Sequence, residues 1–109
     1  MAQRLLRKSK YKILHCGFED HQGEIDIVAV DGRTVVFVEV KTRSTDQAGL
    51  PASAVDEAKQ KKIAQTAKSY LRRFHLDDYQ IRFDVVAILL NPQGQPQIDH
   101  LIDAFREVD

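Results

Sequence analysis

The sequence predicts an α/β fold in which a mixed β-sheet is flanked by helices. Two apolar runs rich in Val, Ile and Phe, 24–30 and 34–43, flank Asp31 and Gly32, a dipeptide favoured in tight hairpin turns. A stretch of helical period separates this hairpin from the next apolar run, 80–90. A long helix between the third and fourth strands is the usual crossover of a layered α/β domain. The hairpin and the crossover together give the fold class.

The remaining elements are assigned within 109 residues, the length of one domain. Residues 2–9 predict the end of a helix, and residues 11–18 predict a first strand. The long helix is predicted to open at Ser53, because Asp56 three residues later resembles a capping box. It is predicted to run to about Phe74, with most of its basic residues outside one apolar stripe.

The apolar stripe of this helix and the elements after it complete the assignment. The stripe consists of Val55, Ile63, Ala67, Tyr70, Leu71 and Phe74. Residues 91–94 read Asn-Pro-Gln-Gly, which is typical of a turn. Residues 97–105 predict a final strand or a short helix, so the whole chain, 1–109, is interpreted as a single domain.

Charge is unevenly distributed along the chain. Sixteen basic and sixteen acidic residues give a net charge of zero. Residues 1–15 nevertheless carry five basic groups and no acid, and residues 57–73 carry six basic groups and one acid. These basic patches indicate either solvated helix faces or a surface that binds the phosphates of a nucleic acid.

Membrane and secreted proteins are disfavoured by the same sequence. The longest apolar run, 85–90, has six residues, whereas a membrane span needs roughly 20. The basic N-terminus is not followed by the apolar stretch of a signal peptide. Cys16 is the only cysteine, which excludes an internal disulfide or a zinc centre built on several cysteines. We therefore expect a cytoplasmic protein with no membrane partner.

The predicted hairpin brings charged residues to one of its faces. A two-residue turn at 31–32 places Glu24 opposite Glu39, and Asp26 lies diagonal to Glu39. Side chains alternate along a strand, so one face carries four charged groups: Glu24, Asp26, Glu39 and Lys41. The opposite face is then apolar: Ile25, Ile27, Val36, Val38 and Val40.

Carboxylates on neighbouring strands repel one another unless a cation offsets their charge. Mg²⁺ suits Asp26 and Glu39, because one or two carboxylates, water and substrate phosphate oxygens are its usual ligands. The alternative is a polar sheet face that is simply solvated, with Glu39 and Lys41 as ordinary surface charges.

Five stretches resemble, in order and over nearly the whole chain, the motifs of the YraN family: GEIDIVAVDG, VVFVEVKTR, AVDEAKQKKIAQTAKSYL, RFDVVAI and IDHLIDAF. That family is similar to the PD-(D/E)XK nuclease superfamily. The resemblance implies a restriction-endonuclease-like fold and hydrolysis of DNA or RNA phosphodiesters with Mg²⁺, for which Mn²⁺ is the expected substitute. Superfamily enzymes often work as dimers, so the resemblance also makes a homodimer an expected assembly.

The resemblance assigns roles to individual residues. Asp26 matches the first metal-binding aspartate, Glu39 the acidic position of the Glu-x-Lys element and Lys41 its lysine. The backbone carbonyl of Val40 is expected to complete the protein's share of the metal ligands. Asp26, Glu39 and Lys41 are therefore the candidate catalytic residues.

Three further residues are weaker candidates. Glu24 is adjacent to the metal-binding set, Lys59 matches a basic position of the YraN pattern, and Gln60 follows it. Lys59 and Gln60 are interpreted either as phosphate contacts or as solvated helix residues. In the family pattern a first-helix Glu lies upstream of the position of Ala2, so the chain is expected to lack the start of that helix and a third ligand.

The sequence leaves the roles of two other residues undecided and is compatible with three functions. His21 lies near the end of the hairpin, and Asp84 either orients Lys41 or makes structural hydrogen bonds. The leading hypothesis is a Mg²⁺-dependent nuclease. A non-catalytic nucleic-acid-binding module with a degenerate site and a structural or protein-interaction domain are its rivals.

Overall fold

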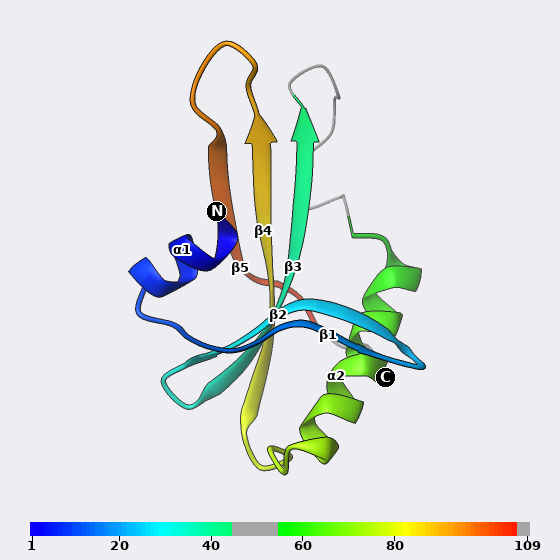
Figure 1. The fold of residues 1–109 in the computed structure, drawn as a ribbon. Helices are drawn as coiled ribbons and strands as arrows, with labels where there is room; N and C mark the ends of the chain where they lie inside the picture. The colour runs from blue at the N-terminus through cyan, green and yellow to red at the C-terminus, as the bar shows by residue number, and fades with distance from the viewer. Residues whose placement is uncertain (45–54, 107–109) are drawn as a thin grey trace.

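A computed structural model describes residues 1–44 and 55–106 and places a five-stranded sheet between two helices (Figure 1). In chain order the elements are α1 (Ala2–Lys8), β1 (Lys12–Asp20), β2 (Gly23–Asp31), β3 (Thr34–Ser44), α2 (Glu57–Arg73), β4 (Gln80–Leu90) and β5 (Gln97–Phe105). The α/β class and the mixed sheet flanked by helices are confirmed, and the segment 97–105 is a strand rather than a helix.

The strands lie side by side in the order β1-β2-β3-β4-β5. β3 and β4 are parallel, whereas every other neighbouring pair is antiparallel. Parallel neighbours need a crossover, and α2 follows β3 and precedes β4 in the chain, as predicted. β3 therefore lies in the middle of the sheet, where its residues are covered from both sides.

The turn between β2 and β3 lies one residue later than predicted. Asp31 pairs with Thr34, so the two central turn residues are Gly32 and Arg33. Gly32 takes the positive φ of 63° that such a turn requires. The predicted register was consequently wrong by two positions, but a shift of two leaves the paired residues, 27–31 and 34–38, on their predicted faces.

Hydrophobic side chains from the two faces of the sheet form two separate clusters. The cluster on the α2 face includes Val28, Val35, Phe37, Ile63, Ala67, Tyr70, Leu71, Phe83 and Val85. The cluster on the α1 face includes Leu6, Tyr11, Ile27, Ala29, Val36, Val38, Val86 and Ile88. Glu39 and Lys41 follow Phe37 at alternate positions on β3, so their side chains belong to the α2 face.

The β1–β2 hairpin bends over α2 (Figure 1), so the side chain of Ile25 lies on a different face of the sheet from the one predicted. Ile25 packs in the α2-face cluster with Phe18, whereas Ile27 lies in the α1-face cluster, where both had been predicted. The ladder between β2 and β3 begins at Ile27, so the residues before it pair with β1 alone. Gly17, with φ of 72°, lies opposite this point in β1 and allows the bend.

The ends of α2 differ slightly from the prediction. Asp56 is the N-cap, and its carboxylate accepts a hydrogen bond from the Lys59 backbone N–H at 2.8 Å. Ser53, the predicted first residue, lies outside the described residues. Phe74 follows the last helical residue and is 41% exposed, so it is not part of the buried stripe.

Candidate functional site

The first feature of the site is a fork between β2 and β3. Their ladder ends where Ile27 pairs with Val38, and the next residue, Asp26, turns its carboxylate toward β3. Asp26 Oδ2 accepts a hydrogen bond from the Val40 backbone N–H at 2.8 Å. In a strand the N–H and C=O of one residue face the same edge, so the Val40 carbonyl also faces the fork. The Asp26 carboxylate and the Val40 backbone therefore lie together at the fork.

Glu39 lies beside this fork, on the central strand β3, and is only 8% exposed. Its Oε1 atom lies 2.8 Å from Lys59 Nζ and 3.8 Å from Lys41 Nζ. A carboxylate this buried is costly unless opposite charge or hydrogen bonds compensate it. Two ammonium groups, one from β3 and one from the first turn of α2, supply that compensation.

The two lysines influence each other's ionisation. Hydrogen bonding with Lys59 lowers the pKa of Lys41, and partial burial lowers it further. The hydrogen bond to Glu39 is the largest cause that raises the pKa of Lys59, and the nearby Asp26 charge also raises it. Lys59 is therefore firmly protonated, whereas Lys41 gives up its proton more readily than an ordinary lysine.

The donor atoms at the fork suit Mg²⁺ better than a metal that requires a cage of side chains. Within 1–44 and 55–106, no three His, Cys, Asp or Glu side chains are grouped closely enough to hold a metal ion. Two carboxylates, Asp26 and Glu39, and the Val40 carbonyl are all oxygen donors. Mg²⁺ is often held by one or two carboxylates with the remaining positions filled by water and phosphate oxygens. The residues present therefore fit this ion.

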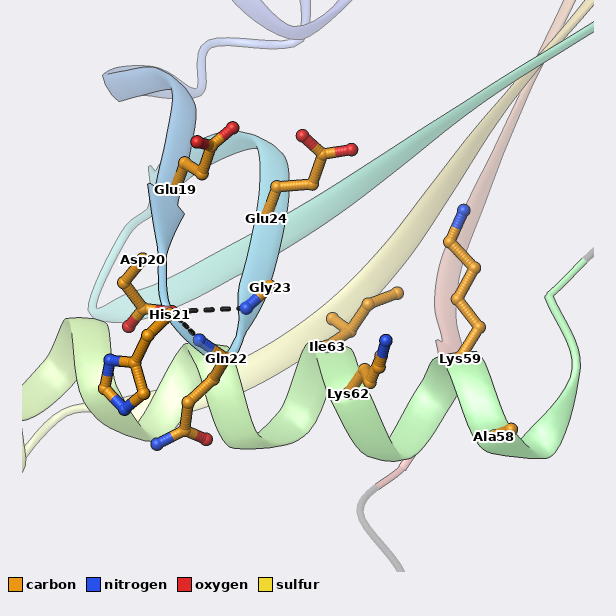
Figure 2. A pocket seen from close by; sticks show the side chains of 10 residues that line it. All are labelled: Glu19, Asp20, His21, Gln22, Gly23, Glu24, Ala58, Lys59, Lys62 and Ile63. Atoms are coloured by element: carbon orange, nitrogen blue, oxygen red, sulfur yellow. Dashed lines mark hydrogen bonds between the residues drawn. The ribbon is translucent and has the colours of Figure 1, made fainter.

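A groove of about 670 Å³ lies next to these residues, between the tip of the β1–β2 hairpin and α2. Figure 2 shows Glu19 and Glu24 on the hairpin side, and Lys59 and Lys62 on the helix side. The tip itself is tied by Asp20 Oδ1, which accepts hydrogen bonds from the N–H groups of residues 22 and 23. Lys59 therefore belongs both to the wall of this groove and to the ion pair with Glu39.

The weaker candidates are placed differently from one another. Glu24 is exposed on the groove wall, and His21 also lines the groove. The Gln60 side chain instead donates a hydrogen bond to the Val55 carbonyl at 2.9 Å, which fixes the start of α2. Of the three additional candidates, Lys59 is the one in direct contact with Glu39.

Asp84 makes structural hydrogen bonds and does not orient Lys41, because it lies on the opposite face of the sheet. It pairs across the ladder with Val38 of the α1-face cluster and is fully buried. Arg82 Nε contacts Asp84 Oδ1 at 2.8 Å, and His100 Nε2 contacts Asp84 Oδ2 at 2.7 Å. Burial raises the pKa of Asp84, but hydrogen bonds, that from Arg82 above all, outweigh burial and lower it overall.

Two contacts around Arg82 were not anticipated from the sequence. Its guanidinium also binds Asp31 Oδ2 at 3.1 Å and the Tyr11 hydroxyl. These groups come from α1–β1, β2, β4 and β5, and residues so far apart in the chain carry no common local pattern. The available signal was the alternation in β4, which places Arg82 and Asp84 on one face.

Among the described residues, no helix combines the length and apolarity that crossing a membrane would require.

Comparison with known proteins identifies relatives along almost the whole chain. Residues 1–88 match the family described as "Uncharacterised protein family UPF0102". A UPF0102 protein of Syntrophus aciditrophicus is 47% identical over 105 residues, which cover 96% of this chain and 82% of that protein. A UPF0102 protein of Caldanaerobacter subterraneus is 41% identical, and the match covers 96% of this chain and 88% of that protein. One of Clostridium beijerinckii is 38% identical, and the match covers 97% of this chain and 87% of that protein. Over this extent of sequence, the chain belongs to the UPF0102 family, the YraN family that its motifs resemble.

Proposed function

We propose that this protein is a Mg²⁺-dependent nuclease that hydrolyses phosphodiester bonds of DNA or RNA. The observation that carries the proposal is the contact of the Asp26 carboxylate with the backbone of Val40, the residue between Glu39 and Lys41, together with the 3.8 Å between the Glu39 carboxylate and the ammonium group of Lys41. The resemblance to the PD-(D/E)XK superfamily adds to it, because these are the residues that its motif assigns to metal binding and catalysis.

Each residue has a distinct part in the proposed reaction. Mg²⁺, when bound, supplies a Lewis acid that polarises a phosphate oxygen and makes water a stronger acid. Asp26, Glu39 and the Val40 carbonyl would hold it. Lys41 orients the attacking water and offsets negative charge that develops on the phosphate. The groove beside the fork offers room for a nucleic-acid strand, with Lys59 and Lys62 facing its phosphates.

The test is the variant Glu39→Gln, assayed on panels of DNA and RNA with Mg²⁺ and with a chelator. We expect the parent to cleave only with Mg²⁺ and the variant to be inactive, because an amide is a poor ligand for a hard dication. Asp78→Asn is the matched control, since Asp78 is an exposed acid beyond the far end of α2. A Glu39→Gln protein that cleaves as fast as the parent would overturn the proposal.

One observation favours a second candidate function, a non-catalytic nucleic-acid-binding module. Glu39 is already neutralised by two lysines, so this side of the fold needs no metal for its charge balance. Both candidates bind nucleic acid less tightly as salt rises, because lysine and arginine contacts release counterions from phosphates. Binding that weakens with salt, together with no cleavage by the parent at any Mg²⁺ concentration, would select the binding module.

A further inference from the structure

We propose that Lys59 is a built-in competitor for the divalent cation: its ammonium group holds Glu39 until the cation binds, and is then released into the groove. This inference rests on the proposed function, and it adds to that function a mechanism by which metal loading and the substrate groove are coupled. It is carried by the contacts, exposures and backbone anchors of Lys59, Glu39 and Lys41.

The contact distances identify Lys59 as the main partner of Glu39. Lys59 Nζ lies 2.8 Å from Glu39 Oε1, which is the distance of a charge-assisted hydrogen bond. Lys41 Nζ lies 3.8 Å from the same oxygen, beyond hydrogen-bond range. A dication ligated by Glu39 would bind the same carboxylate and would repel a neighbouring ammonium group. Lys59 and the dication therefore compete for Glu39.

The exposure of the three side chains indicates which group leaves. The Glu39 side chain is 9% exposed and that of Lys41 is 16% exposed, whereas that of Lys59 is 43% exposed. Glu39 cannot turn into water, and Lys41 is held in the middle of the sheet. Lys59 loses little by moving, because its ammonium group is already near solvent and is strongly hydrated once free.

The backbone of Lys59 is fixed, so that only its side chain has to move. Its N–H donates to the Asp56 cap at 2.8 Å, and the next residue, Gln60, holds the Val55 carbonyl at 2.9 Å. Figure 2 shows the Lys59 side chain extending from α2 along the groove, on the side to which Glu24 projects. A released ammonium group thus stays on the groove wall, where it can contact a phosphate of the substrate.

The experiment measures Mn²⁺ affinity by calorimetry in the absence of nucleic acid, with the intact chain and the variants Lys59→Gln, Lys59→Arg and Lys62→Gln. Lys62 is the matched control, because it is a second lysine of α2 on the same groove wall. We expect Lys59→Gln to bind Mn²⁺ roughly three- to tenfold more tightly, the range of a partly exposed ion pair with one buried member. Lys59→Arg and Lys62→Gln should bind like the parent, since each leaves a cation at Glu39.

A second measurement follows the parent protein directly, so that the test does not depend on the stability of a variant. In protein labelled with ¹³C-lysine, Mg²⁺ should shift the Lys59 side-chain signal and leave that of Lys62 unchanged. Unaltered Mn²⁺ affinity in Lys59→Gln, or a Lys59 signal that ignores bound Mg²⁺, would overturn the inference while leaving the proposed nuclease intact. A parent that binds no metal at all would overturn both.

Discussion

The buried ion pair of Asp84 and Arg82 makes a quantitative prediction about stability. Asp84 is fully buried, and it holds Arg82 through two contacts, Nε to Oδ1 at 2.8 Å and Nη2 to Oδ2 at 2.9 Å. The change Asp84→Asn keeps the shape of the side chain and removes its charge. Arg82 is then left largely buried beside a neutral amide, with Asp31 as its remaining acidic partner in the described part of the chain.

Breaking a buried ion pair by removing one partner costs about 3 to 5 kcal/mol. Asparagine retains an oxygen that can accept from the Asp103 N–H, so we expect a loss of about 3 kcal/mol in the free energy of unfolding. Total stabilities are about 5 to 15 kcal/mol, so this is a large fraction. At about 4 to 8 °C per kcal/mol for a domain near this length, the melting temperature should fall by at least about 12 °C.

The assay is chemical denaturation at pH 7 followed by circular dichroism. The double variant Arg82→Met/Asp84→Leu should lose less than the sum of its single changes, because apolar residues of similar volume often replace a buried pair at little cost. Arg106→Ala is the control, since Arg106 pairs with Asp103 at the surface and should leave stability unchanged. An Asp84→Asn protein within about 1 kcal/mol of the parent would refute the reasoning.

Four further predictions concern acid, two glycines and metal. Folding lowers the pKa of Asp84, so its stabilising charge is fully present above the ordinary aspartate value of 3.8. That contribution is lost as pH falls through the lower folded pKa. In acid-unfolding curves the difference in stability between the parent and Asp84→Asn should therefore close below about pH 4. Gly23→Ala should lower the free energy of unfolding by about 1 to 3 kcal/mol in denaturant titrations, because the added Cβ would lie 2.9 Å from the Thr66 hydroxyl oxygen. The second change Thr66→Ala should restore part of that loss. Gly17→Ala should lower the free energy of unfolding by about 1 kcal/mol from its φ of 72° alone, since no atom of the described residues lies within 4 Å of the added methyl group. Mn²⁺ at 100 times its dissociation constant should stabilise the parent by about 2.7 kcal/mol in thermal melts and leave Glu39→Gln unshifted.

The local patterns of the sequence were sufficient to predict most of the fold. Gln80–Leu90 has the predicted bounds, and the hairpin and the crossover helix lie where their hydrophobic periods place them. The hairpin register was wrong by two, yet Val28 and Phe37 still share the α2 face, because side chains alternate with a period of two. An error of one position would have separated them.

Contacts that depend on the arrangement of distant elements could not be predicted. The ion pair of Lys59 with Glu39 depends on how α2 crosses the sheet, which the nineteen intervening residues do not specify. The position of Asp84 on the far face depends on the register of two parallel strands, 38 with 84. The face of Ile25 was missed because a bend at a glycine interrupts the alternation on which the prediction rested.

The hydrogen bond from Val40 to Asp26 gives this aspartate a structural role besides the proposed metal binding, since its carboxylate replaces the missing backbone partner where β2 leaves β3. Truncation of Asp26 to alanine would remove that substitute partner and weaken the junction between the two strands. Loss of activity in such a protein would therefore not distinguish a structural role from metal binding. Asparagine keeps one oxygen to receive the amide hydrogen while removing the negative charge, which makes it the substitution that separates scaffolding from ligation at this position.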